Sequence, residues 1–493
     1  MNLRAAISSL LLVSLCGCAI GPSYKKPDVA TPQAFKEQSG WKPAALTAMP
    51  DSGQWWKIYD DPVLDDLEAQ VEVNNQNLRA AEAAFRQAEA LVDEARASYF
   101  PNLNYSLDRT RSRGASISNS AITGNTGTGG RINDQYSVSL GASWVPDIWG
   151  KVRRQVESDV AHAEASAADL AGARLSAQAS LATDYFQLRI DDEQALMLDE
   201  TVSAYQASLQ ITQNQYQAGI VSEADVASAE SQLEAAQAQA INVRLQRKLM
   251  EHAIAVLAGK PPSELEIQSL PPKASLTVPV LPTDTPSTLL ERRPDVVSAE
   301  RGMAAANAGI GIAEGGYFPD LTISASDGFE ASVMHDLISA PNRVWAVGAE
   351  LAGNLFSFGA THAQVKQAEA AYDQTVAEYR QTALSAFQQV EDQLATLREL
   401  EREAEVQDQA LTAAKNASRI ARNQYQAGIV AYTNVVVAET TELNEQQTAF
   451  TIRANRLIAS VALVEALGGG WDPAQTPKVS REATNAQPGT AGP

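Results

Sequence analysis

The chain contains one eight-residue segment twice. Residues 214–221 read NQYQAGIV, and residues 423–430 repeat the same eight letters. A second pair of similar segments is Tyr-Phe-Pro, at 99–101 and again at 317–319. Because repetition over such a distance means that one structural unit has been duplicated, the sequence predicts two copies of one large unit and not a series of unrelated domains.

The amino terminus has the pattern of a secretory signal. Arg4 precedes an apolar run at 7–15 that is too short to span a bilayer. The run closes with Leu15-Cys16-Gly17-Cys18, which resembles a bacterial lipoprotein cleavage box. We expect a signal peptide at 1–17 and an acylated Cys18 as the first residue of the mature chain, held in the membrane by several acyl chains. An ordinary signal with an incidental cysteine is the alternative.

The segments next to the signal and at the far end are unlike a compact domain. Residues 18–61 carry scattered prolines and predict an extended leader behind the lipid anchor. Residues 471–493 are rich in Ala, Thr and Pro and predict a disordered tail. The formal net charge of −21 argues against a nucleic-acid partner, which requires a basic surface.

Each repeat contains one very long helix. Residues 361–427 contain neither Gly nor Pro. Apolar residues recur there at alternating steps of three and four, as in a coiled coil. At 1.5 Å per residue such a helix reaches about 100 Å, and residues 151–217 are its counterpart. The octapeptide follows each long helix, where Gly219 or Gly428 can adopt the left-handed conformation that ends a helix. Each octapeptide therefore predicts a hairpin tip followed by a return helix. The tips lie at about 216–222 and 425–431, and the return helices at 223–257 and 432–467.

Segments with an apolar residue at every second position lie between the helices of each repeat. The alternation is clear in residues 136–144 and 345–351, and it predicts β-hairpins at about 102–145 and 320–356. Four strands with one apolar and one polar face fit the wall of a transmembrane β-barrel. Four strands cannot close, however, and an open edge in lipid leaves backbone groups unsatisfied. Three chains give twelve strands and a bore, so we expect a trimer. The alternative is a soluble hairpin packed on a helical bundle, with its tryptophans as core residues.

Together these segments predict a chain that is mainly helical, internally duplicated and completed by a small membrane sheet. We expect the long helices to form an α-helical tube below the membrane and the strands to form a twelve-stranded trimeric barrel. The first repeat is expected at 62–270, a linker at 271–285 and the second repeat at 286–470.

The chain as a whole resembles the TolC-like outer-membrane efflux channels, and more closely the NodT-like lipoprotein branch that serves resistance–nodulation–division pumps. The marks of this resemblance are Trp55-Trp56, Asp61-Pro62, Asn74 to Leu78, the two Tyr-Phe-Pro segments, and the run 289–296 with Ala299-Glu300. The resemblance implies a homotrimeric, lipid-anchored channel in the outer membrane with a long periplasmic extension. It also implies docking to a periplasmic adaptor and an inner-membrane transporter, and passive conduction of small molecules to the exterior.

The resemblance places a gate at the hairpin tips, where relatives are held closed by a ring of Tyr, Arg and Asp. Tyr425 matches the tyrosine, and Asp225 matches an acidic partner from the first repeat. Val430 stands where such relatives have the arginine, and Asn434 and Val437 stand where they have aspartates. An arginine–carboxylate latch therefore cannot form. We expect a closed tip held by weaker hydrogen bonds of Asp225, Tyr425 and Asn434 and by packing of the two valines. The alternative is that Asp225 is only a favourable charge in the first turn of a helix.

The exposed ends of the two hairpins are the expected docking surface for the adaptor. Glycine there allows a close backbone approach, although its role in ending a helix is a sufficient alternative explanation. The candidate docking residues are Tyr216, Gly219, Val221, Ser222, Gly428 and Ala431.

Other classes of function find little support. The four histidines are scattered, no cysteine pair remains after processing, and no cluster has the spacing of a metal site. We therefore expect no enzyme, no metal and no cofactor. A structural coiled-coil lipoprotein is one alternative, although it does not need strands with an apolar face. The outer-membrane duct of a type I protein secretion system is another, because it would share the fold.

Overall fold

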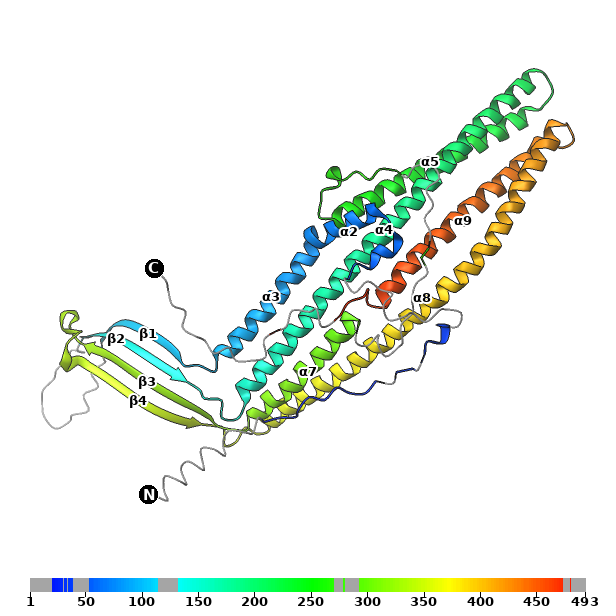
Figure 1. The fold of residues 1–493 in the computed structure, drawn as a ribbon. Coiled ribbons are helices and arrows are strands. Elements are labelled where there is room, and N and C mark those ends of the chain that lie inside the picture. Colours follow the sequence, from blue (N-terminus) through cyan, green and yellow to red (C-terminus); the bar gives the residue numbers. More distant parts are fainter. Residues whose placement is uncertain are drawn as a thin grey trace.

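The computed structural model describes residues 20–29, 31–32, 34–38, 53–113, 132–269, 278–279, 292–472 and 479. The predicted signal peptide, Cys18 and most of the predicted linker and tail lie outside these residues. The described part is elongated, with a small β-sheet at one end, two helical hairpin tips at the other and long helices between them (Figure 1).

The predicted internal duplication is confirmed by pairs of helices of equal length. In each repeat a 22-residue helix leads to the sheet, a 67-residue helix runs from the sheet to the tip, and a 35-residue helix returns. The first repeat contains α3 (Gln76–Ala97), α4 (Lys151–Gln217) and α5 (Glu223–Leu257), and the second contains α7 (Pro294–Gly315), α8 (Ala360–Gln426) and α9 (Tyr432–Ala466). The fold is mainly helical with a small sheet, as expected.

The two long helices begin at equivalent glycines. Gly150 (φ 80°) and Gly359 (φ 88°) precede α4 and α8 in the left-handed conformation, which glycine adopts without steric cost. On α8 the buried residues include Tyr379, Ala383 and Val390, so the coiled-coil spacing read from the sequence marks the packing face of this helix. None of the helices that the structure describes combines the length and the apolar character needed to cross a bilayer.

The four strands form one antiparallel sheet in the order β1-β2-β3-β4. The strands are β1 (Asn102–Arg113), β2 (Ile132–Trp144), β3 (Asp320–Ala331) and β4 (Arg343–Ala352). On one face Tyr105, Leu140 and Trp345 are 86%, 66% and 72% exposed, while the opposite face carries mostly polar residues and glycine. Trp345 is therefore not a core residue, and the alternative of a tryptophan core beneath a soluble hairpin is wrong for this side chain.

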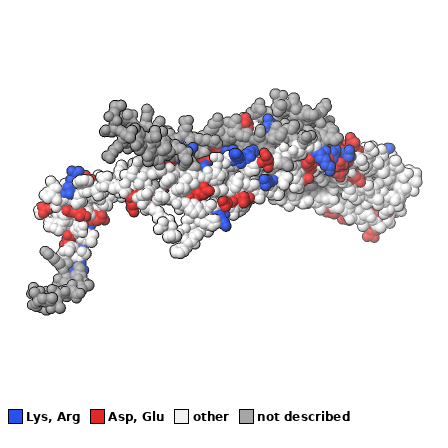
Figure 2. Space-filling view, turned by 90° about the horizontal axis from the view of Figure 1, so that it is seen from below, with Lys and Arg blue, Asp and Glu red and all other residues white. Residues whose placement is uncertain are grey.

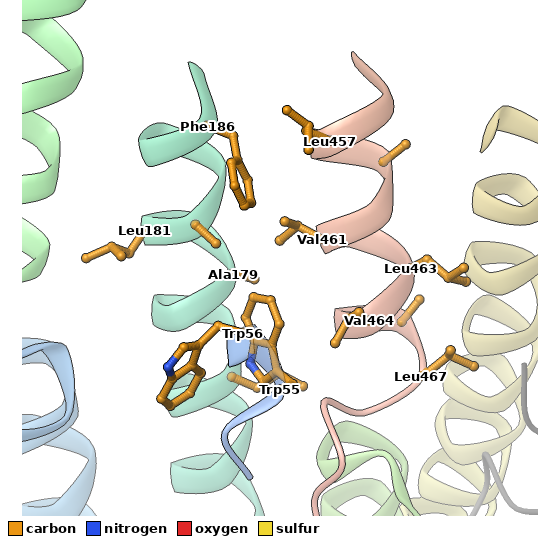
Figure 3. Close-up of a cluster of buried hydrophobic side chains, with 14 of the residues drawn as sticks. Trp55, Trp56, Ala179, Leu181, Phe186, Leu457, Val461, Leu463, Val464 and Leu467 are labelled. Carbon is orange, nitrogen blue, oxygen red and sulfur yellow. The ribbon is translucent and has the colours of Figure 1, made fainter. Parts of the chain in front are cut away.

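The main hydrophobic core lies in the middle of the helices and includes part of the leader. The sequence predicts an extended leader, but Trp55–Tyr59 form a 3₁₀ helix, η2, whose Trp55 and Trp56 are only 1% and 3% exposed. Figure 3 shows these two indoles beside α4 and α9, near side chains such as Ala179 and Val464. The prediction of an extended leader is wrong at this point, because large aromatic side chains contribute strongly to stability when they are buried.

Two of the sequence marks have structural roles at helix starts. Asp61 caps α2 (Pro62–Asn74) by accepting hydrogen bonds from the first backbone N–H groups of the helix. The same carboxylate accepts a bond from the Tyr185 hydroxyl of α4 at 2.5 Å. At the start of α7, the Arg293 guanidinium donates to the Ala466 carbonyl at 3.0 Å, near the end of α9. These marks therefore hold the middle of the molecule together.

Candidate functional site

Each hairpin tip is a helix end closed by glycine. In the first tip the Ile220 N–H donates to the Gln215 carbonyl at 2.9 Å, and Gly219 has a φ of 69°. In the second tip Ile429 makes the equivalent bond at 2.9 Å, and Gly428 has a φ of 70°. In this arrangement a left-handed glycine allows the last carbonyl groups of the helix to find donors. The repeated octapeptide therefore turns the chain at the end of a long helix.

The return helices start differently in the two repeats. α5 starts with a capping box, in which the Ser222 hydroxyl accepts from the Asp225 N–H at 3.3 Å and the Asp225 carboxylate accepts from the Ser222 N–H at 3.0 Å. α9 starts after Ala431, whose side chain makes no capping bond, and Asn434 takes the position of the aspartate. Asp225 therefore caps the start of α5 and lies in the first turn of this helix, where a negative charge is favourable. Its part in a gate stays a prediction.

Two tyrosines attach the second tip to the first long helix. The Tyr425 hydroxyl donates to Gln215 Oε1 of α4 at 2.7 Å, and the Tyr432 hydroxyl lies 3.0 Å from the Ser208 hydroxyl of the same helix. The two aromatic rings lie 5.2 Å apart, and Tyr432 is only 2% exposed. Burial raises the pKa of both hydroxyls, and the negative charge of Asp225 adds to this rise for Tyr425. Both tyrosines therefore stay protonated near neutral pH and can donate.

An ion pair between a buried carboxylate and a half-exposed guanidinium lies on the second hairpin, farther from the turn. Glu439 of α9 is 5% exposed and accepts from Arg422 of α8 at 2.6 Å and from Gln232 of α5 at 3.1 Å. Hydrogen bonding to Glu439 raises the pKa of the Arg422 guanidinium. The sequence alone does not reveal this pair, because Arg422 lies four residues before the end of α8 and Glu439 lies seven residues after the start of α9. The first repeat has Gln213 and Glu230 at the equivalent positions, so the ion pair cannot form there.

The remaining predicted gate residues differ in exposure on the second hairpin. Val437 is 67% exposed, Asn434 is exposed in the first turn of α9, and Val430 is half-buried. Within one chain the structure brings Tyr425 onto α4 and records no hydrogen bond between Tyr425 and the other gate candidates among the described residues. Of the docking candidates, Tyr216 is 46% exposed, Gly219, Ser222, Gly428 and Ala431 are exposed, and Val221 is half-buried.

Two isoleucines at the tips are absent from the predicted set. Ile220 and Ile429 are each 71% exposed. Figure 2 shows few charged side chains on this end of the molecule. The signal that could have found the isoleucines is their recurrence in the octapeptide, because the turn requires the glycine but does not require isoleucine next to it.

Comparison with known proteins identifies the family. Residues 67–260 and 285–469 match the family described as Outer membrane efflux protein, and the chain belongs to this family. The pyoverdine export outer membrane protein OpmQ of Pseudomonas aeruginosa is 31% identical over 473 residues, which cover 96% of this chain and 97% of OpmQ. The probable outer membrane lipoprotein SilC of Salmonella typhimurium is 28% identical over 473 residues, which cover 94% of this chain and 98% of SilC. The solved structure of the outer-membrane channel OprN is 29% identical, has a TM-score of 0.82 and matches 92% of this chain and 100% of OprN.

The family decides between the functional classes that the sequence left open. The chain is the outer-membrane channel component of an efflux pump, and it is located in the outer membrane. Its long helices form the periplasmic extension. The family is one of channels, which confirms the resemblance and decides against a structural coiled-coil lipoprotein.

We expect Ser222→Ala to loosen the start of α5. Loss of a helix cap costs about 1 kcal/mol, so the amides of residues 227–230 should exchange about fivefold faster. Hydrogen–deuterium exchange with mass spectrometry on the purified protein measures this. Ser228→Ala is the matched control, because its hydroxyl bonds the Ala224 carbonyl within the same helix and leaves the cap intact. Equal exchange in the two variants would contradict the capping role.

Proposed function

We propose that three copies of the chain close into one continuous channel. Within the described residues, β1 and β4 form the outer edges of the sheet. A free edge in lipid costs several kcal/mol for each unsatisfied backbone group. Pairing β4 of one copy with β1 of the next removes both edges. Eight strands from two copies would be filled by their own side chains, whereas twelve strands from three copies leave a bore.

The duplication supports the same assembly in the helices. α4 packs against α7 and α9 of the other repeat. By the duplication, the equivalent partners of α8 are α3 and α5. Within the described part of one chain, however, α8 packs mainly on α7 and α9 of its own repeat. In a trimer, α3 and α5 of the next copy would complete the surroundings of α8.

An apolar stripe on α5 fits this contact between copies. Ile241, Leu245 and Leu249 recur every four residues and are 66%, 51% and 45% exposed. The equivalent positions of α9 are partly or fully buried; they are Phe450, Ala454 and Ile458. The stripe on α5 is therefore the counterpart of a surface that is already packed in the second repeat. We infer that it packs on α8 of the next copy.

The proposed channel conducts passively. The strand face opposite the apolar one carries mostly polar residues and glycine, which suits a water-filled bore. The long helices would continue this bore into the periplasm, where an adaptor and an inner-membrane resistance–nodulation–division transporter would deliver the cargo. The name of OpmQ, a pyoverdine exporter, supports small organic molecules as the class of cargo.

A ring of tyrosine–glutamine bonds would close the periplasmic end, and the observation that supports it is one such bond within the chain. Tyr425 binds Gln215 within the chain. Tyr216 is the counterpart of Tyr425 in the first repeat, and Gln424 is the counterpart of Gln215 in the second repeat. Both Tyr216 and Gln424 are exposed. In a trimer, Tyr216 of one copy would reach Gln424 of the next, which makes six equivalent bonds around the tip. The ring needs no arginine, and it leaves Asp225 free to cap α5.

Cross-linking tests the trimer and the ring together. In Tyr216→Cys with Gln424→Cys, a short bismaleimide should join neighbouring chains into covalent dimers and trimers on denaturing gels. In the matched variant Gln215→Cys with Tyr425→Cys, the same reagent should join two residues of one chain and produce no larger species. If the first variant stays at the mass of one chain while the second reacts internally, the proposed contact between copies is wrong.

Removing the tyrosine hydroxyls should open the tip. Each hydrogen bond contributes about 1 kcal/mol, so Tyr216→Phe with Tyr425→Phe should raise the closed-state current across planar bilayers by at least about tenfold. Tyr317→Phe is the control, because this exposed tyrosine lies next to the sheet. The tyrosine ring is not the latch if the closed-state current is unchanged in the double tyrosine variant but rises in Asp225→Ala with Asn434→Ala. That result would assign the latch to the acidic and amide residues.

We further propose that Ile220 and Ile429 form the centre of the adaptor-docking surface. Burying one isoleucine contributes about 1.5–3 kcal/mol, so Ile220→Ser with Ile429→Ser should weaken adaptor binding by more than about tenfold. Surface plasmon resonance with the purified trimer and its adaptor measures this. Val73→Ser is the control, because Val73 is 65% exposed on α2, far from the tips. If the two variants bind alike, docking occurs elsewhere.

A further inference from the structure

The apolar face of the sheet becomes basic at the end farthest from the helices. Along β1, Leu103 and Leu107 lie on this face and are 77% and 70% exposed. Arg109, Arg111 and Arg113 follow at the same two-residue step, and alternate residues of a strand share a face. The change from leucine to arginine therefore occurs along one continuous surface and not between the two sides of the sheet.

The neighbouring strand supplies one acidic and one aromatic partner for these arginines. The register sets Tyr136 opposite Arg109 and Asp134 opposite Arg111. The Arg109 guanidinium lies 5.4 Å from the centre of the Tyr136 ring, and Arg111 Nε lies 3.7 Å from Asp134 Oδ1. Arg109 and Arg111 nevertheless keep 60% and 62% of their side chains exposed. Their guanidinium groups are therefore available to a ligand at the surface.

The other edge of the sheet carries a further arginine on the same face. Arg343 of β4 binds both carboxylate oxygens of Asp327 at 2.9 Å and is 58% exposed. Asp327 is paired across the strands with Trp345, which is one of the exposed residues of the apolar face. Arg343 therefore also stands next to the apolar surface, at the end of the sheet away from the helices.

The two faces of the sheet differ in the sign of their charges. Every Arg in the four described strands lies on the apolar face, and these residues, Arg109, Arg111, Arg113 and Arg343, are called the arginine band here. The strand acids on that face are Asp134 and Asp327, and those on the opposite face are Asp108, Asp320, Glu330 and Glu350. The band is thus a positive surface on a chain whose formal net charge is −21.

We propose that the arginine band binds the phosphate-bearing head groups of lipids in the outer leaflet. The inference rests on the proposed channel, because it requires the apolar face to lie against lipid. An arginine within the hydrocarbon is destabilising, whereas at the interface this cost is small. A guanidinium group also binds phosphate through two parallel hydrogen bonds. The tips point into the periplasm, so the opposite end of the strands, where the band lies, meets the outer leaflet.

The proposed trimer makes the band continuous around the sheet. The pairing of β2 with β3 sets Tyr136 opposite Ala331. Trp345 of β4 is the counterpart of Tyr136, and Arg113 of β1 is the counterpart of Ala331. If β4 of one copy pairs with β1 of the next in the same register, Trp345 stands opposite Arg113. The arginines of neighbouring copies would therefore meet beside an indole ring, which suits the boundary between acyl chains and head groups.

Native mass spectrometry of the full-length trimer tests the proposal. The probes are diphosphorylated lipid A and the same lipid after removal of its phosphates. The wild-type trimer should retain the diphosphorylated lipid with an affinity at least about tenfold above that for the dephosphorylated one. Arg109→Gln with Arg111→Gln and Arg113→Gln should remove this preference. The matched control, Lys57→Gln with Arg79→Gln and Arg86→Gln, changes the same charge on exposed residues of the helical part and should keep it.

The outcomes of this experiment distinguish a failure of the lipid-binding proposal from a failure of the channel proposal. If the wild-type trimer retains the two lipids equally, the proposal is wrong. It is also wrong if the triple arginine variant conducts and still prefers the phosphorylated lipid. Loss of the bound lipid in excess inorganic phosphate, with no effect of chloride at equal ionic strength, would show a site for free phosphate and overturn the lipid assignment. If the wild-type chain neither inserts into bilayers nor conducts, the channel proposal itself fails, which is a different result.

Discussion

A sheet with one apolar face and two open edges depends on closure. Water can satisfy the edges of an exposed sheet, but lipid cannot, so β1 and β4, the edge strands among the described residues, require further partners. The duplication provides them, because the contacts between the two repeats within the chain, β2 with β3, α4 with α7 and α4 with α9, can be repeated between chains. One type of interface then serves both the membrane sheet and the helical tube. The proposed ring of tips at the far end would follow from the same repetition.

The two repeats are equal in length but not in local chemistry. The first tip starts its return helix with a Ser222–Asp225 capping box, while the second uses Tyr432, which packs on Tyr425 and bonds to Ser208. The second hairpin also has the Arg422–Glu439 ion pair, in which only the carboxylate is buried. A channel built from such repeats has two kinds of hairpin alternating around its axis. The second kind is the more firmly attached to its neighbour within the chain.

Sequence reasoning reached the residues of the site more easily than their partners. Tyr425 and Asp225 lie at the tips, and their part in a gate stays a prediction. The sequence does not show that Tyr425 bonds Gln215 on the other long helix. The Tyr425–Gln215 bond depends on how two helices of about 100 Å lie side by side, and a small change in their stagger would change such pairs. The leader shows the same limit, since the burial of Trp55 depends on space between α4 and α9 that only the packed helices create.

The sequence by itself determined the duplication, the lengths of the long helices, the turns at Gly219 and Gly428, and the alternation that gives the sheet two faces. These features are local or periodic, so propensity, spacing and backbone geometry are sufficient to specify them. Only the tertiary structure decided which surfaces meet: the leader tryptophans in the core, the second tip on α4, and the arginines of separate strands on one face at one end of the sheet. Such contacts join residues far apart in the chain, and their geometry follows from the packing of whole helices and from strand register.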